Sequence, residues 1–291
     1  LNQYDGGLGV SAGYAMAEFP LVRGLRVIGG ARLERTDLRL DVVDFATGVP
    51  LVDGDPLTQA DSARTGAINV TDVLPSLNLV YSVRRNMNLR AAATRTLARP
   101  TFREIAPFAS FDFATDGPLV GNPNLDRTLI TNLDLRYEWF NAPGSILAVS
   151  GYYKYLDQPI ELVIVDIENN VNQFQNVDEA RILGAEFELR QAVRNFGGVF
   201  AEAPVVRNLN LGGNLTVTQS TITIADDELR TRREVDPNAD ETRALQGQSP
   251  YIVNANLSYE TARTSIGAYF NVFGRRLARV GVVDVYDQPA P

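Results

Sequence analysis

A strict alternation of apolar and polar residues runs through much of this sequence. In "TNLDLRYEW" the apolar members Leu133, Leu135, Tyr137 and Trp139 are separated by single polar residues. Successive side chains of a strand point to opposite faces, so this pattern predicts a strand with one apolar and one polar face. Clear or looser forms of the pattern predict about ten strands, at residues 8–19, 25–40, 70–82, 89–96, 131–139, 146–165, 179–193, 208–224, 251–260 and 265–279.

The links between these strands alternate between short and long. Polar links predict five hairpins: short ones lie at residues 20–24, 84–88, 141–145 and 261–265, and a longer variant lies at residues 194–207. Long loops rich in Asp, Asn, Gly and Pro lie at residues 44–64, 97–127, 166–178 and 225–248. Compact soluble domains seldom contain so many long connections, whereas outer-membrane barrels have short turns at one end and long loops at the other. We therefore predict an all-β, antiparallel, up-and-down transmembrane β-barrel.

Aromatic residues stand just before four of the five hairpin links: Phe19, Tyr81, Trp139 with Phe140, and Tyr259. Rings gathered at one level of a sheet are typical of a membrane interface, where their apolar bodies and polar edges are both satisfied. Strands are rich in aromatic residues in any case, so the row is also compatible with an ordinary sheet.

The polar rows predict a wet interior. A one-residue slip of 131–139 would turn its charged residues toward lipid, where an Arg at the midplane costs about 2–4 kcal/mol. The polar row is also too hydrophilic for the dry core of a sandwich. We expect it to face water or a polar plug, and the residues predicted to line this lumen are Asn132, Asp134, Arg136, Glu138, Glu186, Glu188, Asn254 and Asn256.

Composition excludes several functions. A net charge of -8 argues against nucleic acid as a partner. The chain has no Cys and no His, which removes disulfides, thiolate zinc sites and the Ser-His-Asp triad. Glu186 and Glu188 share a strand face, but neighbouring lumen carboxylates are more common than a glycosidase pair. We predict no enzyme activity, no metal site and no cofactor.

Three stretches resemble the TonB-dependent outer-membrane receptor family: "ATRTLARPTFREIAPF", "VGNPNLDRTLITNLDLRYEWF" and "VSGYYKYLDQPIE". The likeness rests on the Arg99-Pro100 step that closes a strand, the Phe102-Arg103-Glu104 turn with Pro107, the "GNPNL" entry into the next strand, and the following Tyr153-Lys154 strand. It extends over most of the chain as part of the barrel domain.

The resemblance implies a plugged barrel, which has 22 strands in outer-membrane transporters. About ten strands cannot close such a barrel, and an open sheet edge in lipid would leave backbone groups unpaired. We therefore expect residues 1–291 to be a partial barrel domain, with the plug and the final strands outside this chain. The resemblance also implies the TonB complex as a partner acting through that plug, outer-membrane lipid and lipopolysaccharide as surroundings, and the outer membrane of a Gram-negative bacterium as the location.

The resemblance further implies a receptor that binds a scarce extracellular ligand and imports it with energy supplied by TonB. The ligand would be a siderophore, cobalamin, haem or an oligosaccharide. Residues of the external loops that could contact it, or that could instead pack a loop against its neighbours, are Arg99, Phe102, Arg103, Phe108, Phe111, Asp112, Phe113 and Asp116. Two other functions stay open: a passive porin-like channel, and a soluble β-sheet module that binds ligands outside the cell.

Overall fold

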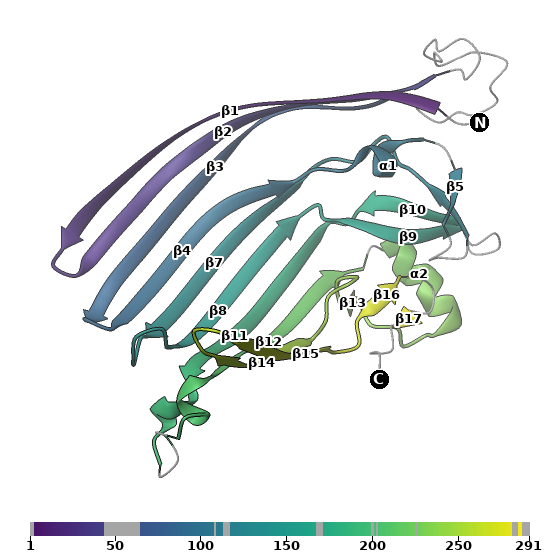
Figure 1. Ribbon diagram of the computed structural model, residues 1–291. Coiled ribbons are helices and arrows are strands. Elements are labelled where there is room, and N and C mark those ends of the chain that lie inside the picture. The colour runs from purple at the N-terminus through teal and green to yellow at the C-terminus, as the bar shows by residue number, and fades with distance from the viewer. Residues whose placement is uncertain are drawn as a thin grey trace, which may run out of the picture.

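The alternating segments form the strands of one long antiparallel sheet (Figure 1). The computed structural model describes residues 3–43, 65–107, 109–112, 117–166, 171–198, 201, 203–224, 226–280 and 285–286. In the main sheet these strands neighbour one another in chain order: β1 (Gln3–Val22), β2 (Leu25–Val43), β3 (Thr65–Arg84), β4 (Met87–Ala98), β7 (Thr128–Trp139), β8 (Ile146–Asp157), β11 (Glu179–Ala192), β12 (Leu209–Thr223), β14 (Tyr251–Glu260) and β15 (Ser265–Phe273). A short strand, β13 (Thr242–Arg243), adds to β12.

The up-and-down topology and the five hairpins predicted from the sequence are confirmed. One predicted strand, residues 146–165, is divided in two. It breaks at Gln158, which has a φ of 54°, and at Pro159, which has no amide hydrogen to donate. After the break the chain continues as β9 (Ile160–Asp166), which lies outside the main sheet. Residues 265–279 divide similarly into β15 and β16 (Leu277–Arg279), which pairs with β17 (Val285–Tyr286).

The two faces of the main sheet differ in chemistry. We call the face that carries Leu133 and Leu135 the outer face, and the face that carries Asn132 and Glu138 the inner face. On the outer face Leu135 is 54% exposed and Leu257 is 44% exposed, with no second layer of protein over them among the described residues. On the inner face Asn132 and Glu138 are each 7% exposed. A soluble fold would cover so long an apolar row, so this distribution favours hydrocarbon outside and a polar interior.

The long connections contain ordered structure, which differs from the structureless loops expected from the sequence. A second sheet in the order β5-β6-β10-β9 stands at the end of the molecule opposite the hairpin turns (Figure 1). Its other strands are β5 (Ala109–Asp112), β6 (Gly117–Val120) and β10 (Val171–Asn176). The long connections also contain the helices α1 (Phe102–Ile105) and α2 (Asp226–Val235). The short helical turns η1 (Val193–Phe196) and η2 (Val206–Asn208) lie in the hairpin link between β11 and β12. Residues 44–64 lie outside the described part.

The main apolar core lies at this loop end rather than between two layers. Leu38, Leu40 and Ile68 of β2 and β3 pack against residues of the α1 loop, namely Ile105, Ala106 and Leu125. The core therefore fastens the α1 loop to the inner face of the first strands. Among the described residues, no helix has the length and apolar character needed to cross a membrane.

Replacing Leu135 with Arg puts a guanidinium on the outer face near the middle of β7. We expect the free energy of unfolding of the intact protein in phosphatidylcholine vesicles to fall by about 2–4 kcal/mol, because the cation loses its hydration in hydrocarbon. The matched control, Asp134→Arg, places the same side chain on the inner face and should change it by about 0.5 kcal/mol or less. Denaturant titration followed by tryptophan fluorescence measures both. Equal losses would contradict a lipid-facing outer row.

Candidate functional site: the loop end and the inner wall

The α1 loop is shaped by the residues that close β4. Strand β4 ends at Ala98, Pro100 donates no hydrogen bond, and α1 begins after Thr101. The Glu104 carboxylate accepts a hydrogen bond from the Thr101 amide at 2.6 Å, and the Asn122 amide donates to the Glu104 carbonyl at 2.7 Å. The chain then reverses at Asn122, whose side-chain oxygen accepts from the Asn124 amide at 3.0 Å. These contacts confirm the turn structure predicted for this stretch.

Gly121 is required by the close approach of two backbone segments. A Cβ atom at this position would lie 2.1 Å from the Ala106 carbonyl oxygen, which is far inside contact distance. Any larger residue must therefore push residues 106 and 121 apart and disturb the loop that carries α1.

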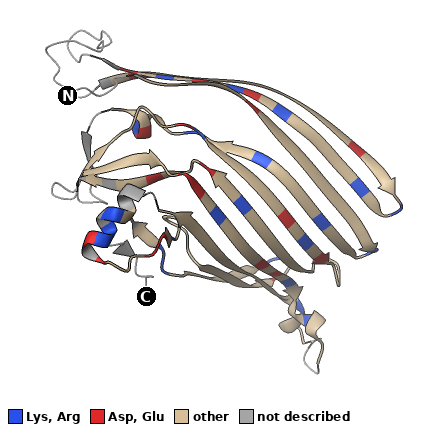
Figure 2. Ribbon diagram, turned by 180° about the vertical axis from the view of Figure 1, so that it is seen from behind, with Lys and Arg blue, Asp and Glu red and all other residues tan. Residues whose placement is uncertain are grey.

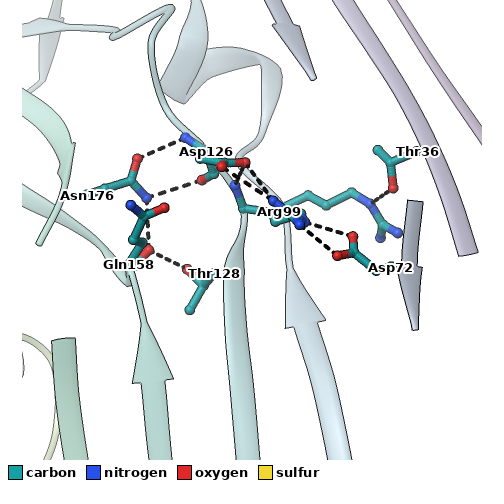
Figure 3. A network of polar contacts seen from close by, with 8 residues as sticks. Thr36, Asp72, Arg99, Asp126, Thr128, Gln158 and Asn176 are labelled. Carbon is teal, nitrogen blue, oxygen red and sulfur yellow. Dashed lines mark hydrogen bonds and ion pairs between the residues drawn. The ribbon is translucent and has the colours of Figure 1, made fainter. Parts of the chain in front are cut away.

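Arg99 is held against strand β2 (Figure 3). Its Nε donates to the Thr36 hydroxyl at 2.8 Å, and its guanidinium forms an ion pair with Glu34, a carboxylate that also accepts from Arg32 Nε at 2.6 Å. Burial lowers the pKa of Arg99 from its ordinary value, and the nearby positive charge of Arg32 lowers it further. The contacts that the structure gives Arg99 are thus within the protein, and its role in ligand binding stays a prediction.

A second arginine, which the sequence analysis did not single out, joins strand β3 to the α1 loop. Arg127 donates from Nε and Nη2 to the two oxygens of Asp72, both at 2.7 Å, and from Nη1 to Asp126 at 3.1 Å. The hydrogen bond with Asp72 raises the pKa of Arg127 above its ordinary value. The only local signal was an Arg directly after "GNPNLD", and its partner Asp72 lies 55 residues away in sequence.

Asn176 extends this network to the second sheet (Figure 3). Its Nδ2 donates to the carbonyl oxygens of Asp126 at 3.1 Å and Gln158 at 2.8 Å, and its Oδ1 accepts from the Asp126 amide at 2.8 Å. The Thr128 hydroxyl also donates to the Gln158 carbonyl, at 3.0 Å. The α1 loop, β10 and the break between β8 and β9 are therefore tied together by one polar network.

The remaining external candidates are placed unequally. Phe102 is half-buried, packs against the core at the loop end, and lies 6.4 Å from the Tyr4 ring between centroids. Arg103 is exposed. Phe111 and Asp112 belong to β5, with side chains outside the described part, and Phe108, Phe113 and Asp116 also lie outside it. The ligand role of this set stays a prediction.

An almost completely buried ion pair connects two further loops. Arg243 of β13 lies 2.7 Å from Glu161 of β9, and their side chains are 3% and 2% exposed. The other Glu161 oxygen accepts from the Gln246 amide at 2.9 Å, while Gln246 Nε2 donates to the Ala278 carbonyl at 2.9 Å. The loop that contains α2 is thereby fixed to the second sheet and to β16.

Charged residues form a ladder across the inner face near the hairpin end. Arg90 of β4 donates to Glu138 at 2.8 Å, and Arg136 donates to Glu138 at 3.0 Å and to Glu188 at 2.5 Å. Arg190 lies 3.1 Å from the other Glu188 oxygen. Figure 2 shows positive and negative residues on several neighbouring strands of the main sheet. The structure thus brings together Arg136, Glu138 and Glu188 of the predicted lumen residues.

The other predicted lumen residues lie on the same face without joining that ladder. Asn254 bridges Asn214 and Asn271 at 2.7 and 2.5 Å, and Asn256 lies over Gly212, where a Cβ would be 2.3 Å from its side-chain oxygen. Asp134 is exposed, Glu186 is half-buried, and register places them opposite Tyr152 and Ser150. Within the described residues, no group of three or more Asp, Glu, His or Cys side chains is arranged to hold a metal ion. The arrangement can bind and guide polar solutes along a fixed, charged wall.

Residues 2–289 match the family model described as "TonB dependent receptor-like, beta-barrel". Solved structures share the fold at low identity. The alcaligin receptor FauA from Bordetella pertussis has 10% identity and a TM-score of 0.55, over 93% of this chain and 38% of its own. The ferric yersiniabactin uptake receptor FyuA from Yersinia pestis has 14% identity and a TM-score of 0.57, over 94% and 35%. The ferric citrate transporter FecA, in its unliganded form, has 10% identity and a TM-score of 0.62, over 96% and 34%.

The chain thus spans little more than a third of the length of these three solved chains. No curated protein matches its sequence significantly.

Changing Asp72 to Asn removes the negative charge that accepts hydrogen bonds from Nε and Nη2 of Arg127. We expect the α1 loop to open more easily, by about 1–3 kcal/mol, because a partly buried guanidinium loses its carboxylate. Hydrogen exchange at the amides of Ala106 and Asn122 measures this opening. Glu18→Gln, which breaks the exposed pair between Arg26 and Glu18, is the matched control and should leave those amides unchanged. Similar effects of both changes would refute the role assigned to Arg127.

Changing Gly121 to Ala should displace residues 106 and 121 and expose α1. The expected result is faster tryptic cleavage after Arg103 in the intact, membrane-embedded protein. Gly13→Ala is the matched control, because a Cβ at Gly13 meets nothing within 4 Å. Unchanged cleavage of the Gly121 variant would show that the loop tolerates the extra atom.

Proposed function

This chain belongs to the family of TonB-dependent receptor β-barrels, and from that premise we propose that the whole protein is an outer-membrane active-transport receptor. It binds a scarce extracellular ligand and imports it with energy supplied by TonB. The observation that carries the proposal is the two-faced sheet, with Leu135 and Leu257 open to the outside and a polar, ion-paired wall opposite. In a closed barrel such a wall would line a path for a solute, which the dry core of a sandwich does not provide.

The proposed ligand is a small molecule of the kinds that this scaffold carries: a siderophore, cobalamin, haem or an oligosaccharide. Two of these structural neighbours are named for ferric compounds, ferric yersiniabactin and ferric citrate, and this supports an iron chelate as the first ligand to test. The loop end supports a binding role because several loops meet there on a shared framework of ion pairs. No catalytic step is part of the proposal.

The proposal places further strands and a plug domain elsewhere in the whole protein. Strands β1 and β15 each have one neighbour in the main sheet, so each leaves a row of backbone groups without a strand partner among the described residues. Such groups cost several kcal/mol each in hydrocarbon, which supports additional strands on both sides. The TonB complex would act through the plug, and lipid and lipopolysaccharide of a Gram-negative outer membrane would surround the outer face.

The mechanism follows from how the loops are fixed to the wall. A ligand that binds the loop end more tightly in a closed arrangement shifts the loops toward that arrangement. Because the α1 loop, β10 and the break after β8 share one polar network, the shift reaches the strands of the inner wall together. Contacts of that wall with the plug would carry the change inward.

The test is uptake of radioactive iron, supplied as a ferric siderophore, by Gram-negative cells that produce the intact protein. Uptake should stop when the proton motive force is collapsed or when TonB is deleted, while binding to the cells persists. Uptake that continues unchanged, together with open-channel conductance in planar bilayers, would establish a passive porin-like channel instead. Purification of the intact protein without detergent would point to a soluble binding module.

A further inference from the structure

Lys154 is the only lysine in a sequence with 27 basic residues. It stands on β8, three residues before that strand ends, and register places it on the inner face, between Asn132 of β7 and Ile182 of β11. Its side chain is half-buried. Because burying a charged group is costly unless it is paired, a half-buried ammonium on the inner wall is expected to have a negatively charged partner.

Among the described residues, five arginines of the inner face have carboxylate partners, and Lys154 has none. Arg90, Arg136 and Arg190 lie in the ladder with Glu138 and Glu188, and on β2 Arg26 and Arg32 pair with Glu18 and Glu34. Within the described residues, no carboxylate lies within 4.0 Å of Lys154 Nζ. Asp134, the neighbouring inner position on β7, is exposed and forms no ion pair with it.

The groups around Lys154 are neutral and held in place. Its Nζ donates to Asn132 Oδ1 at 3.3 Å, and Asn132 is oriented by a hydrogen bond of 3.2 Å from its Nδ2 to the Thr96 hydroxyl. Nζ also lies 5.9 Å from the centre of the Tyr152 ring, whose hydroxyl is 2.6 Å from the Thr218 hydroxyl. An ammonium has three donors, so this amide oxygen leaves two of them for an incoming acceptor.

Tyr152 has a fixed position because it crosses a glycine. A Cβ at Gly184 of β11 would lie 2.3 Å from the Tyr152 ring carbon Cζ, so only glycine leaves room for the ring. The ring and the Asn132 amide oxygen thus form a fixed surround for the ammonium group, and the Thr218 hydroxyl holds the ring. A cation that is already held in place loses less freedom when a ligand binds, which favours a recognition role.

The site also lies where a solute would arrive from outside. Strand β8 leaves the main sheet just beyond Lys154, at Gln158 and Pro159, and passes into the second sheet at the loop end. The next inner-face positions toward the loop end hold buried apolar side chains: Ala180 is fully buried and Ile222 is 1% exposed. The first unpaired cation below the loop assembly on this part of the wall is therefore Lys154.

We propose that Lys154, with Asn132 and Tyr152, binds the carboxylate of a small-molecule ligand on the inner wall. This inference rests on the proposed function, because it assumes that a solute reaches this wall. A carboxylate supplies the missing negative charge and two acceptor atoms for the two remaining ammonium donors. The Tyr152 ring gives an apolar surface beside it, so an anion with a planar or apolar body fits better than a bare ion.

The experiment uses the intact receptor in detergent and benzoate as the probe, with benzamide as its uncharged counterpart. The receptor is produced with isotope-labelled lysine, which leaves all three N–H donors in place, and the Lys154 signal is the one missing from the Lys154→Met spectrum. Benzoate should shift this signal and benzamide should not. Isothermal titration calorimetry measures benzoate binding to the variants, whose Kd should rise at least about fivefold in Lys154→Met and stay within about twofold in Lys154→Arg, which keeps the charge. The matched control, Asp134→Asn, removes a nearby negative charge and should not weaken binding.

Three results would overturn the site. The first is equal benzoate affinity of wild type and a Lys154→Met variant that keeps the heat-resistant electrophoretic mobility of a folded barrel. The second is equal binding of benzamide. The third is a Lys154 signal that benzoate cannot move because a carboxylate of another part of the receptor already holds the amine.

Binding in detergent needs no energised membrane, so benzoate binding through Lys154 without energised uptake would overturn the proposed function alone. Energised uptake combined with any of the three results would overturn this site alone.

Discussion

The rest of this structure depends on hydrogen bonding between neighbouring strands. Across the middle of the sheet the register of this pairing does not slip by a single residue. In the main sheet every strand from β2 to β14, except the short β13, has strand partners on both sides, and Leu133, for example, lies opposite Ala93 and Tyr153. A peptide group without a partner costs several kcal/mol in hydrocarbon, so the pairing must be complete across the span. With the pairing complete, successive side chains of each strand point to opposite faces. Every Leu of β7 therefore lies on the outer face and every charged residue of β7 on the inner face.

The loop end follows a different principle, because side chains rather than strand pairing decide its arrangement. Arg99, Arg127 and Arg243 each join segments more than fifty residues apart, and each meets a carboxylate that is itself buried. An exposed ion pair contributes little, but a buried charge that loses its partner is costly, so these pairs define one arrangement of the loops. The apolar core around Ile105 adds the burial that ion pairs alone would not supply.

The sheet could be predicted from the sequence because its signal is local: an alternating run, a short turn and the next alternating run. The second sheet could not, since "VNQFQN" of β10 is polar and its partners include β6, fifty residues earlier. The same limit applies to the polar contacts. Arg99 belongs to a recognisable motif, but that motif does not indicate Glu34 as its partner. No local pattern marks Arg127, because its partner Asp72 lies on another strand. Residues such as Asn132 and Asn254 could be assigned to a face from the alternation of residues along their strands. The ladder formed by Arg136 depends on the register between strands, which the alternation does not give.

The break at Gln158 and Pro159 bends β8 without ending the ribbon to which it belongs. On either side of the bend the same two chain segments remain paired, from Glu179 with Asp157 to Asn176 with Ile160. Two backbone hydrogen bonds cross the bend itself, from Gln158 to Asp178 and from Val177 to Pro159. One continuous two-stranded arm therefore runs from the hairpin end of the wall to the far tip of the second sheet (Figure 1). The arm joins the main sheet at Asp157, three residues from Lys154, so a displacement of that tip would act on the wall beside Lys154.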